Sequence, residues 1–414
     1  MNNWIKKPLS ELIENGSIEL GRGRIISKID IQNIPGLYPI YSSSAKGDGR
    51  LGTYGKYMFD EELITWSVDG GGNLFYRPKH KFSVTNVSGF MRIHSKSIDY
   101  RFLHYLLSFQ HSQITFDYQT KAHPSVIKNL YYFVPLPISE QYKIAQILST
   151  VDDAIEQTEA LIHKYQRIKQ GLMQDLLTRG VDANGQLRQV AKLAPSLYKH
   201  NDDQWIPNEW TIRTIENLSI YVGSGITPKG GSEVYVSEGV MFIRSQNVTF
   251  EGLLLNDVAY IDDQIHRSMC RSEIFPFDVL INITGASIGR CCVFPDWFGR
   301  ANVNQHVCAI RFASPDYYDS NYLSYVLSSW IGQSQIDKLN AGGNRQGLNY
   351  QQLRSFQIPW PEKNERKIIV DILKRNDELI TIEKNNYLKL LSLKQGLMQD
   401  LLTSKVRVNA LLKN

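Results

Sequence analysis

The sequence predicts an α+β protein in which two mixed α/β domains are held apart by two long antiparallel helices, arranged as a pseudo-two-fold tandem duplication. The decapeptide KQGLMQDLLT occurs twice, at residues 169–178 and 394–403. Each copy ends a stretch with helical periodicity, and each stretch follows a Pro-x-Pro stop. An internal repeat of this length is typical of a duplicated architecture, so each half should carry one domain and one helix.

Weaker matches precede both decapeptides in the same order. Residues 134–137 (VPLP) match residues 358–361 (IPWP), and residues 103–108 (LHYLLS) match residues 323–328 (LSYVLS). Their shared order, with a slowly drifting offset, indicates duplication with short insertions. The predicted boundaries are a first domain at 1–137, a helix at 138–178, a linker at 179–203, a second domain at 204–361, a helix at 362–403 and a tail at 404–414.

The two long helices are predicted from composition and spacing. Residues 141–178 contain no proline and one glycine, and their apolar residues recur in steps of three and four. So narrow an apolar stripe on a long helix is typical of packing along a second helix. The first helix leads into the second domain and the second helix ends the chain, so lengthwise packing requires an antiparallel pair. We interpret Glu365 and Lys367, near the start of the second helix, as a solvated helix turn rather than a nuclease motif.

Composition excludes several classes of protein. The 414 residues are 42% hydrophobic and carry a net charge of +5, which excludes whole-chain disorder and permits a nucleic-acid partner without requiring one. The four cysteines form no CxxC pair and are expected to be free thiols. The sequence has neither the apolar core of a signal peptide nor a spanning helix, so a cytoplasmic protein with no membrane partner is expected.

Motifs for catalysis are missing. Walker A, [DN]PP[FY] and HExxH motifs do not occur, and the glycines at 21–23 and 285–289 do not satisfy GxGxxG, so we expect no catalytic residue, no metal and no cofactor in this chain. Cys308 lies two residues from His306, and we interpret it as a core residue of a strand rather than half of a catalytic pair.

Both domains carry basic residues interleaved with amides, aromatic residues and glycines, most densely at residues 342–349. Arginine can donate to guanine, Asn or Gln can pair with adenine, and Lys or Arg can neutralise phosphate. For any single residue the alternative is an ordinary solvated loop. The candidate DNA-binding residues are Lys46, Arg50, Lys56, Arg77, Lys79, Lys121, His123, Arg290, Asn302, Asn304, Gln305, His306, Asn344, Arg345, Gln346 and Asn349.

The order of elements resembles the specificity subunit of a type I restriction–modification system. The resemblance is carried by residues 280–289 (LINITGASIG), 302–306 (NVNQH), 342–347 (GGNRQG) and 359–361 (PWP), and by both decapeptides. The first domain departs from the second, since it has DGGG at 69–72 and no GGNRQG stretch.

The resemblance implies two target-recognition domains, held apart by two long conserved helices, that read a bipartite double-stranded DNA target. It also implies a non-catalytic subunit whose partners are two modification (methyltransferase) subunits, which bind S-adenosylmethionine, and restriction subunits. A runner-up hypothesis is a non-DNA helical scaffold that presents two ligand-binding domains, and a third is an enzyme with an unrecognised site. Binding to a specific duplex discriminates between the first two.

The identical decapeptides predict a partner surface. Core packing tolerates swaps among apolar residues, so exact identity suggests one surface for two copies of one partner. The alternative is a core shared by the two helix ends. The candidate partner-binding residues are Gln170, Leu172, Met173, Gln174, Leu176, Leu177, Gln395, Leu397, Met398, Gln399, Leu401 and Leu402.

Overall fold

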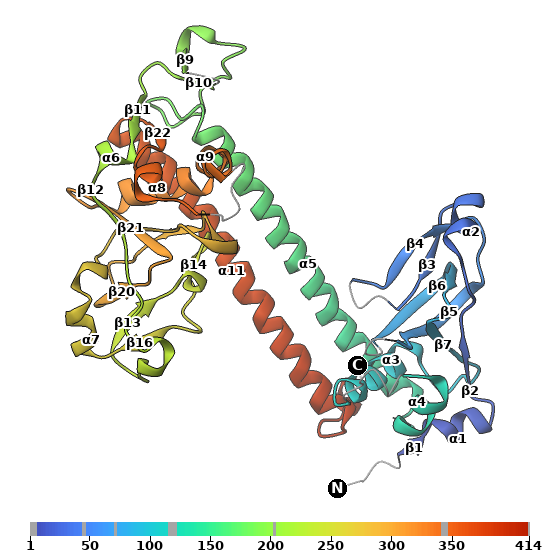
Figure 1. Cartoon of the computed structure of the whole chain (residues 1–414). Coiled ribbons are helices and arrows are strands. Elements are labelled where there is room, and N and C mark those ends of the chain that lie inside the picture. The colour runs from blue at the N-terminus through green and yellow to red at the C-terminus, as the bar shows by residue number, and fades with distance from the viewer. Residues whose placement is uncertain are drawn as a thin grey trace. The chain divides into compact units, whose positions relative to one another are not determined.

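The structure, a computed structural model, describes residues 6–43, 47–69, 73–114, 122–201, 204–340 and 347–412. The chain divides into two compact units (Figure 1). The first unit contains Met1–Ala160 and Lys384–Asn414, and the second contains Leu161–Glu383. The two long helices, α5 (Ile138–Leu176) and α11 (Lys363–Leu402), each contribute residues to both units. The predicted α+β class with two long helices is confirmed.

The first unit is built on a six-stranded sheet in the order β2-β7-β5-β6-β3-β4. All neighbours in this sheet are antiparallel except the parallel pair β3 and β6. The strands are β2 (Ile18–Arg22), β3 (Tyr38–Tyr41), β4 (Arg50–Tyr54), β5 (Phe59–Ser67), β6 (Leu74–Val84) and β7 (Ser88–Ile93). The helices are α1 (Leu9–Glu14), α2 (Lys28–Asn33), α3 (Tyr100–His111) and α4 (Pro124–Leu130), and β1 (Lys7–Pro8) pairs with β8 (Tyr132–Phe133).

Helix α3 connects the sheet of the first unit to its helical part. The Asp99 carboxylate caps the helix by accepting from the Phe102 backbone N–H at 2.8 Å. Phe102 and Leu103 are fully buried on the inner face of α3, and Trp66 of β5 belongs to the same core. Burial of this face, rather than intrinsic helix propensity, accounts for most of the stability of so short a helix.

The second unit contains two four-stranded sheets, ordered β12-β21-β18-β19 and β16-β13-β20-β17. The first is antiparallel throughout, whereas β13 and β20 of the second are parallel. Their strands are β12 (Ser219–Ser224), β13 (Val240–Ile243), β16 (Ala259–Ile261), β17 (Glu273–Ile274), β18 (Val279–Asn282), β19 (Cys291–Val293), β20 (Ala301–Val303) and β21 (Val307–Phe312). Pairs β9 (Tyr198–Asn201) with β10 (Gln204–Pro207), β11 (Thr211–Thr214) with β22 (Gln357–Trp360), and β14 (Val248–Thr249) with β15 (Gly252–Leu253) complete the strands. The helices are α6 (Ile215–Leu218), α7 (Asp263–Ser268), α8 (Tyr317–Ser328), α9 (Trp330–Asn340) and α10 (Tyr350–Arg354), with short 3-10 turns η1–η6 between elements.

The two units share a helical base and differ in their sheets. A two-stranded antiparallel pair precedes each long helix, β1 with β8 before α5 and β11 with β22 before α11. Helices α3 and α8 occupy equivalent places in the two halves, as do α4 and α10. The duplicated order predicted from the sequence is therefore present in the base, while the sheets above it have diverged.

The long helices run antiparallel within each unit. In the second unit, Lys169 of α5 pairs with Asp377 of α11, and Val181 further along the chain donates to Glu365 near the start of α11. Partner numbers thus fall as residue numbers rise, which defines an antiparallel pair.

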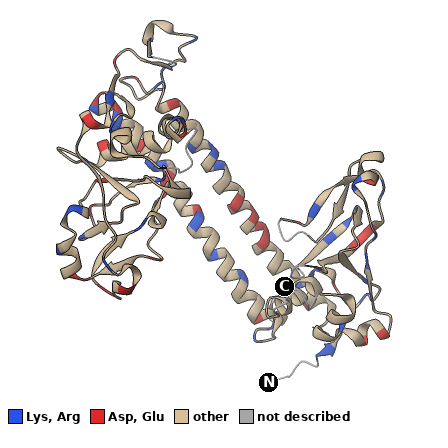
Figure 2. Ribbon diagram, viewed as in Figure 1, with Lys and Arg blue, Asp and Glu red and all other residues tan. Residues whose placement is uncertain are grey.

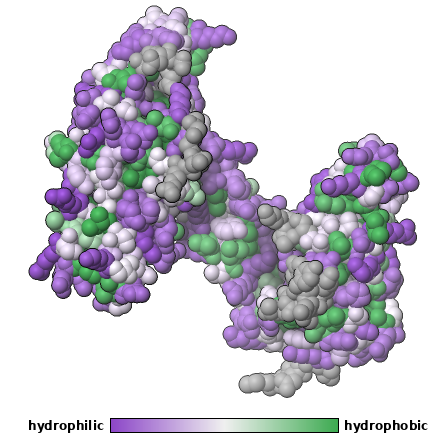
Figure 3. All heavy atoms as spheres, viewed as in Figure 1, coloured by the Kyte–Doolittle hydropathy of each residue, from purple (hydrophilic) through white to green (hydrophobic). Residues whose placement is uncertain are grey.

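Within the described ranges, no helix is long and apolar enough to cross a membrane. Figure 3 shows a face that is mainly hydrophilic, with its hydrophobic residues in small separate groups.

Candidate nucleic-acid interface and helix-end clasps

Three loops of the second unit meet at one end of the sheet β12-β21-β18-β19. Strand β12 ends at Ser224, opposite Cys308, and β18 ends at Asn282, opposite Val307, the first residue of β21. Antiparallel pairing therefore brings the loops after β12 and β18 beside the turn before β21.

A hydrogen-bonded chain of side chains links these loops. The His306 ring lies 2.5 Å from the Thr284 hydroxyl through Nδ1, and its Nε2 lies 3.2 Å from the amide nitrogen of Gln305. The side-chain amide oxygen of Gln305 accepts from the Thr227 hydroxyl. Gln305 is exposed and His306 half-buried, so this polar group is open to a ligand on one side.

The backbone beneath this chain is closely packed. The Asn304 side chain, only 7% exposed, accepts from the His306 N–H at 3.1 Å. The Gly225 N–H donates to the Asn304 carbonyl at 3.1 Å, and a Cβ on Gly225 would lie 1.6 Å from the Val303 carbonyl oxygen. Only glycine permits this approach, which places Thr227 within reach of Gln305.

Asn302 is buried inside the fold. It is 0% exposed, and its amide nitrogen donates to the Met269 carbonyl at 3.0 Å and the Ser272 hydroxyl at 2.8 Å. Its amide oxygen lies 2.6 Å from His266 Nδ1. These bonds tie β20 to the segment after α7 and leave no N–H for a base. This corrects the assignment of Asn302 to the DNA-binding set.

Arg77 is buried as well, at 5% exposed. Its guanidinium donates to the Thr65 hydroxyl at 3.0 Å and the Asp48 carbonyl at 2.6 Å, and it stacks 3.5 Å from the centre of the Tyr41 ring. Burial lowers the pKa of Arg77 to about 10, so the charge persists at neutral pH. Arg77 therefore holds the turn at 47–49 against the sheet, which corrects its assignment as a direct DNA contact.

His123 and Asn349 cap equivalent helices. The His123 Nδ1 accepts from the Ser125 N–H at the start of α4, and the Asn349 oxygen accepts from the Gln352 N–H at 2.8 Å at the start of α10. Both residues were DNA-binding candidates because of their polar side chains, and in the structure both side chains cap a helix.

Four other candidates are exposed: Arg50, Lys56, Lys79 and Arg290. Lys46, Lys121, Asn344, Arg345 and Gln346 lie outside the described residues. The DNA-binding roles of the exposed candidates and of Asn304, Gln305 and His306 stay predictions. In Figure 2 the basic residues of each domain are spread over several strands and loops rather than over one helix.

One surface cluster of the first unit is missing from the candidate set. Lys81 lies 4.8 Å from the centre of the Tyr57 ring, and Tyr57 meets Tyr38 edge-on at 5.1 Å. An exposed cation beside two tyrosines is typical of surfaces that stack on nucleic acid. The sequence contained a clue to this cluster, since Lys81 lies two residues after the candidate Lys79 and Tyr57 directly follows the candidate Lys56.

A clasp of three side chains joins the long helices in the second unit. Asp377 of α11 accepts from the Tyr325 hydroxyl at 2.7 Å and pairs with Lys169 of α5 at 2.6 Å. Burial raises the pKa of Tyr325 far above its usual value of 10, so the phenol stays a donor. Lys169 also lies 5.5 Å from the centre of the Tyr325 ring.

The first unit repeats this clasp with equivalent residues. Asp152 of α5 accepts from the Tyr105 hydroxyl at 2.6 Å and pairs with Lys394 of α11 at 2.6 Å. Burial likewise raises the pKa of Tyr105. Lys169 and Lys394 are the first residues of the two decapeptides, so each decapeptide is held by a tyrosine and an aspartate from the other half of the chain.

The decapeptide leucines lie in the two cores. Leu176 and Leu177 belong to the core of the second unit, and Leu401 and Leu402 to that of the first. Partly buried residues pack against these cores: Leu172, Met173, Leu397 and Met398. The glutamines are exposed: Gln170, Gln174, Gln395 and Gln399. The shared-core alternative therefore accounts for the leucines, and the glutamines remain available to a partner.

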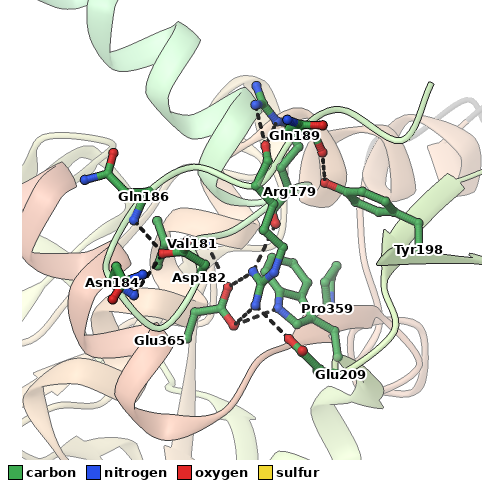
Figure 4. Close-up of polar contacts among 12 residues, drawn as sticks. Arg179, Val181, Asp182, Asn184, Gln186, Gln189, Tyr198, Glu209, Pro359 and Glu365 are labelled. Carbon is green, nitrogen blue, oxygen red and sulfur yellow. Dashed lines mark hydrogen bonds and ion pairs between the residues drawn. The ribbon is translucent and has the colours of Figure 1, made fainter. Parts of the chain in front are cut away.

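Glu365 is a structural residue rather than part of a solvated turn, which corrects that interpretation. It accepts from the Val181 N–H at 2.9 Å and the Trp210 indole at 3.0 Å, and it pairs with Arg188 (Figure 4). Its side chain is 11% exposed. In the first unit, Glu140 holds an equivalent position at the start of α5 and pairs with Arg407 at 2.6 Å.

In the part of the chain that the structure describes, no three His, Cys, Asp or Glu side chains lie close enough together to hold a metal ion. The four cysteines are free thiols, as predicted. Cys308 is fully buried in β21, and burial raises the pKa of its thiol to about 12, which confirms that it is a core residue.

Comparison with known proteins identifies relatives that match most of the chain. It is 24% identical over 393 residues to the type I restriction enzyme MjaVIII specificity subunit of Methanocaldococcus jannaschii, covering 92% of this chain and 88% of that one. It is 26% identical over 326 residues to a putative MjaX specificity subunit of the same organism, covering 77% and 71%. The crystal structure of a type I restriction–modification system S subunit from M. genitalium has the same fold, with a TM-score of 0.63 at 16% identity over 96% of both chains.

These relatives support the DNA-specificity hypothesis and give no support to a non-DNA scaffold. A model of the type I restriction modification DNA specificity domain matches residues 1–165 and 207–392. Because these matches cover most of the chain and fall on both halves, the chain belongs to the family of type I restriction modification DNA specificity proteins.

Proposed function

We propose that this chain is the DNA-reading subunit of a type I restriction–modification complex, in which each domain recognises one half of a bipartite double-stranded target. The observation that carries the proposal is the repeated base: the same clasp of lysine, aspartate and tyrosine occurs in both units, whereas the sheets of the two units differ in number and strand order. The two equivalent helical bases suit two partner subunits of one kind. The two different sets of sheets suit two different DNA sequences.

The exposed glutamines of the two decapeptides are the proposed contacts for two modification subunits, one at each helix end. These subunits supply the methyltransferase chemistry and bind S-adenosylmethionine, and restriction subunits join the assembled complex. The chain itself contributes recognition without catalysis, and the complex acts in the cytoplasm.

Methylation-site sequencing tests the proposal. The chain is purified with its modification subunits and incubated with S-adenosylmethionine and a library of random duplexes. We expect one bipartite motif from the complex, and no methylation from the chain alone or the modification subunits alone. Native mass spectrometry should give one copy of this chain with two modification subunits. Methylation by rigorously purified chain, or methylation without a bipartite motif, would refute the proposal.

A further inference from the structure

We infer that Gln305 reads an adenine in the half-site of the second domain, with Thr227 and His306 holding its side-chain amide in place. The inference rests on the proposed DNA-reading function and adds a residue, a base and a positioning mechanism to it.

The position of Gln305 suits a reading residue. It lies in the turn between β20 and β21 and is exposed, whereas Asn304 before it is 7% exposed and His306 after it is half-buried. The turn is held by the Asn304 N–H, which donates to the Ile243 carbonyl at 3.1 Å. A side chain on a turn fixed in this way loses less conformational freedom on binding than one on a mobile loop.

The Gln305 amide is held at both of its polar atoms. Thr227 donates to its oxygen, and its nitrogen lies 3.2 Å from His306 Nε2. A neutral imidazole satisfies this arrangement if Nε2 accepts from Gln305 and Nδ1 donates to Thr284, which lies 2.5 Å away. One lone pair on the amide oxygen and one N–H on the amide nitrogen are then left for a ligand.

One acceptor beside one donor matches the major-groove edge of adenine. Adenine presents the N7 acceptor next to the N6 donor, whereas guanine presents two acceptors, which the amide oxygen would meet unfavourably. Exchanging the amide donor and acceptor would require the Thr227 hydroxyl to become an acceptor and the His306 ring to change tautomer, with Thr284 then donating to Nδ1. In either arrangement one donor and one acceptor face the ligand side by side, so the residue distinguishes adenine from guanine.

The test uses the chain assembled with its modification subunits and duplexes randomised in each half-site. Gln305→Ala should reduce the preference for adenine at one position by about 5- to 150-fold, while the other half-site is unchanged. Gln305→Glu should shift the preference at that position from adenine toward cytosine, because a carboxylate accepts from the cytosine amino group. Gln264→Ala, at an exposed glutamine on α7 of the same domain, is the matched control and should keep the wild-type motif.

The anchoring is tested with a second pair of variants. Thr227→Val removes the hydroxyl at nearly constant shape and should weaken the adenine preference several-fold, whereas Thr227→Ser keeps the donor and should retain it. Unchanged preference at every position in Gln305→Ala, or an equal loss of affinity for all sequences, would overturn the inference while the bipartite motif of the wild type still supports the proposed function. Equal behaviour of Thr227→Val and Thr227→Ser would overturn the anchoring. A wild-type complex without a bipartite motif would refute the proposed function itself.

Discussion

Replacing the equivalent aspartates of the two clasps should lower the free energy of unfolding by different amounts. Asp377 faces two lysines, since it pairs with Lys169 and also favours the charged form of Lys374, whose pKa burial lowers. In the first unit, Ser149 stands at the position equivalent to Lys374, so Asp152 faces one lysine. Removing Asp377 therefore leaves two neighbouring ammonium groups without their carboxylate.

The magnitudes follow from the contacts. A hydrogen bond from a phenol to a carboxylate contributes about 1.5–3 kcal/mol, and a partly exposed ion pair adds about 0–1 kcal/mol. Both clasps contain these two contacts, so Asp152→Ala should lower the free energy of unfolding of the first unit by about 1.5–4 kcal/mol. Asp377→Ala should cost about 1 kcal/mol more, since its pair is more buried, with side chains 19% and 29% exposed against 30% and 35%, and since the two lysines then repel.

Native-state hydrogen exchange measures each unit separately, which avoids assuming that a two-unit chain unfolds in one step. Amides of α11 at 363–383 report on the second unit, and amides of α5 at 138–160 report on the first. In a Lys374→Ser background the repulsion between the two lysines is absent, so Asp377→Ala should lower the free energy of unfolding by less than it does in the wild-type background. Equal costs in the wild-type background, or an undiminished cost of Asp377→Ala after Lys374→Ser, would refute the reasoning.

Three further predictions concern titration, burial and the partner surface. Burial lowers the pKa of His104 from 6.5 to about 4, so the unfolded chain binds a proton at this residue more tightly than the folded chain does. The free energy of unfolding should therefore fall by about 1–3 kcal/mol as the pH drops from 6.5 toward 4. Thermal unfolding of His104→Gln should depend less on pH over this range. Glu365→Gln should lower the free energy of unfolding by about 2–3 kcal/mol, because Arg188 loses its buried carboxylate, and a change within measurement error in urea unfolding would contradict this. Gln174→Glu with Gln399→Glu should weaken co-purification of the modification subunits without changing unfolding, whereas unaltered assembly would leave the decapeptide a core element alone.

Regular features were predictable from the sequence because they repeat. The apolar stripe of each long helix, the Pro-x-Pro stops and the decapeptides predicted the two helices and the duplicated base, and the structure contains them. The sheets were not predictable in detail, because most strands of the second unit span two to six residues and their pairing depends on contacts distant in the chain. The divergence from one six-stranded sheet to two four-stranded sheets leaves no periodic signal.

Individual site residues were less predictable because one residue type serves several purposes. An asparagine can read a base, cap a helix or satisfy a buried strand, and Asn349 and Asn302 do the second and third. Arg77 likewise holds a turn instead of facing solvent, since Thr65 and Tyr41 enclose its guanidinium. Burial decides among these roles, and burial follows from the tertiary fold rather than from local sequence.

The clasps give a reason why both decapeptides begin with the same lysine while the domains differ. Each decapeptide lysine must fit a tyrosine and an aspartate that belong to the other half, so a change at Lys169 or Lys394 would require a matching change in a distant part of the chain. The groups that receive the lysines come from α3, α5, α8 and α11 and from none of the strands. The sheets can therefore change their exposed loops, such as the turn that carries Gln305, without altering any atom of either clasp. A chain built in this way can acquire a new DNA target in one half while its two helix ends keep the same assembly.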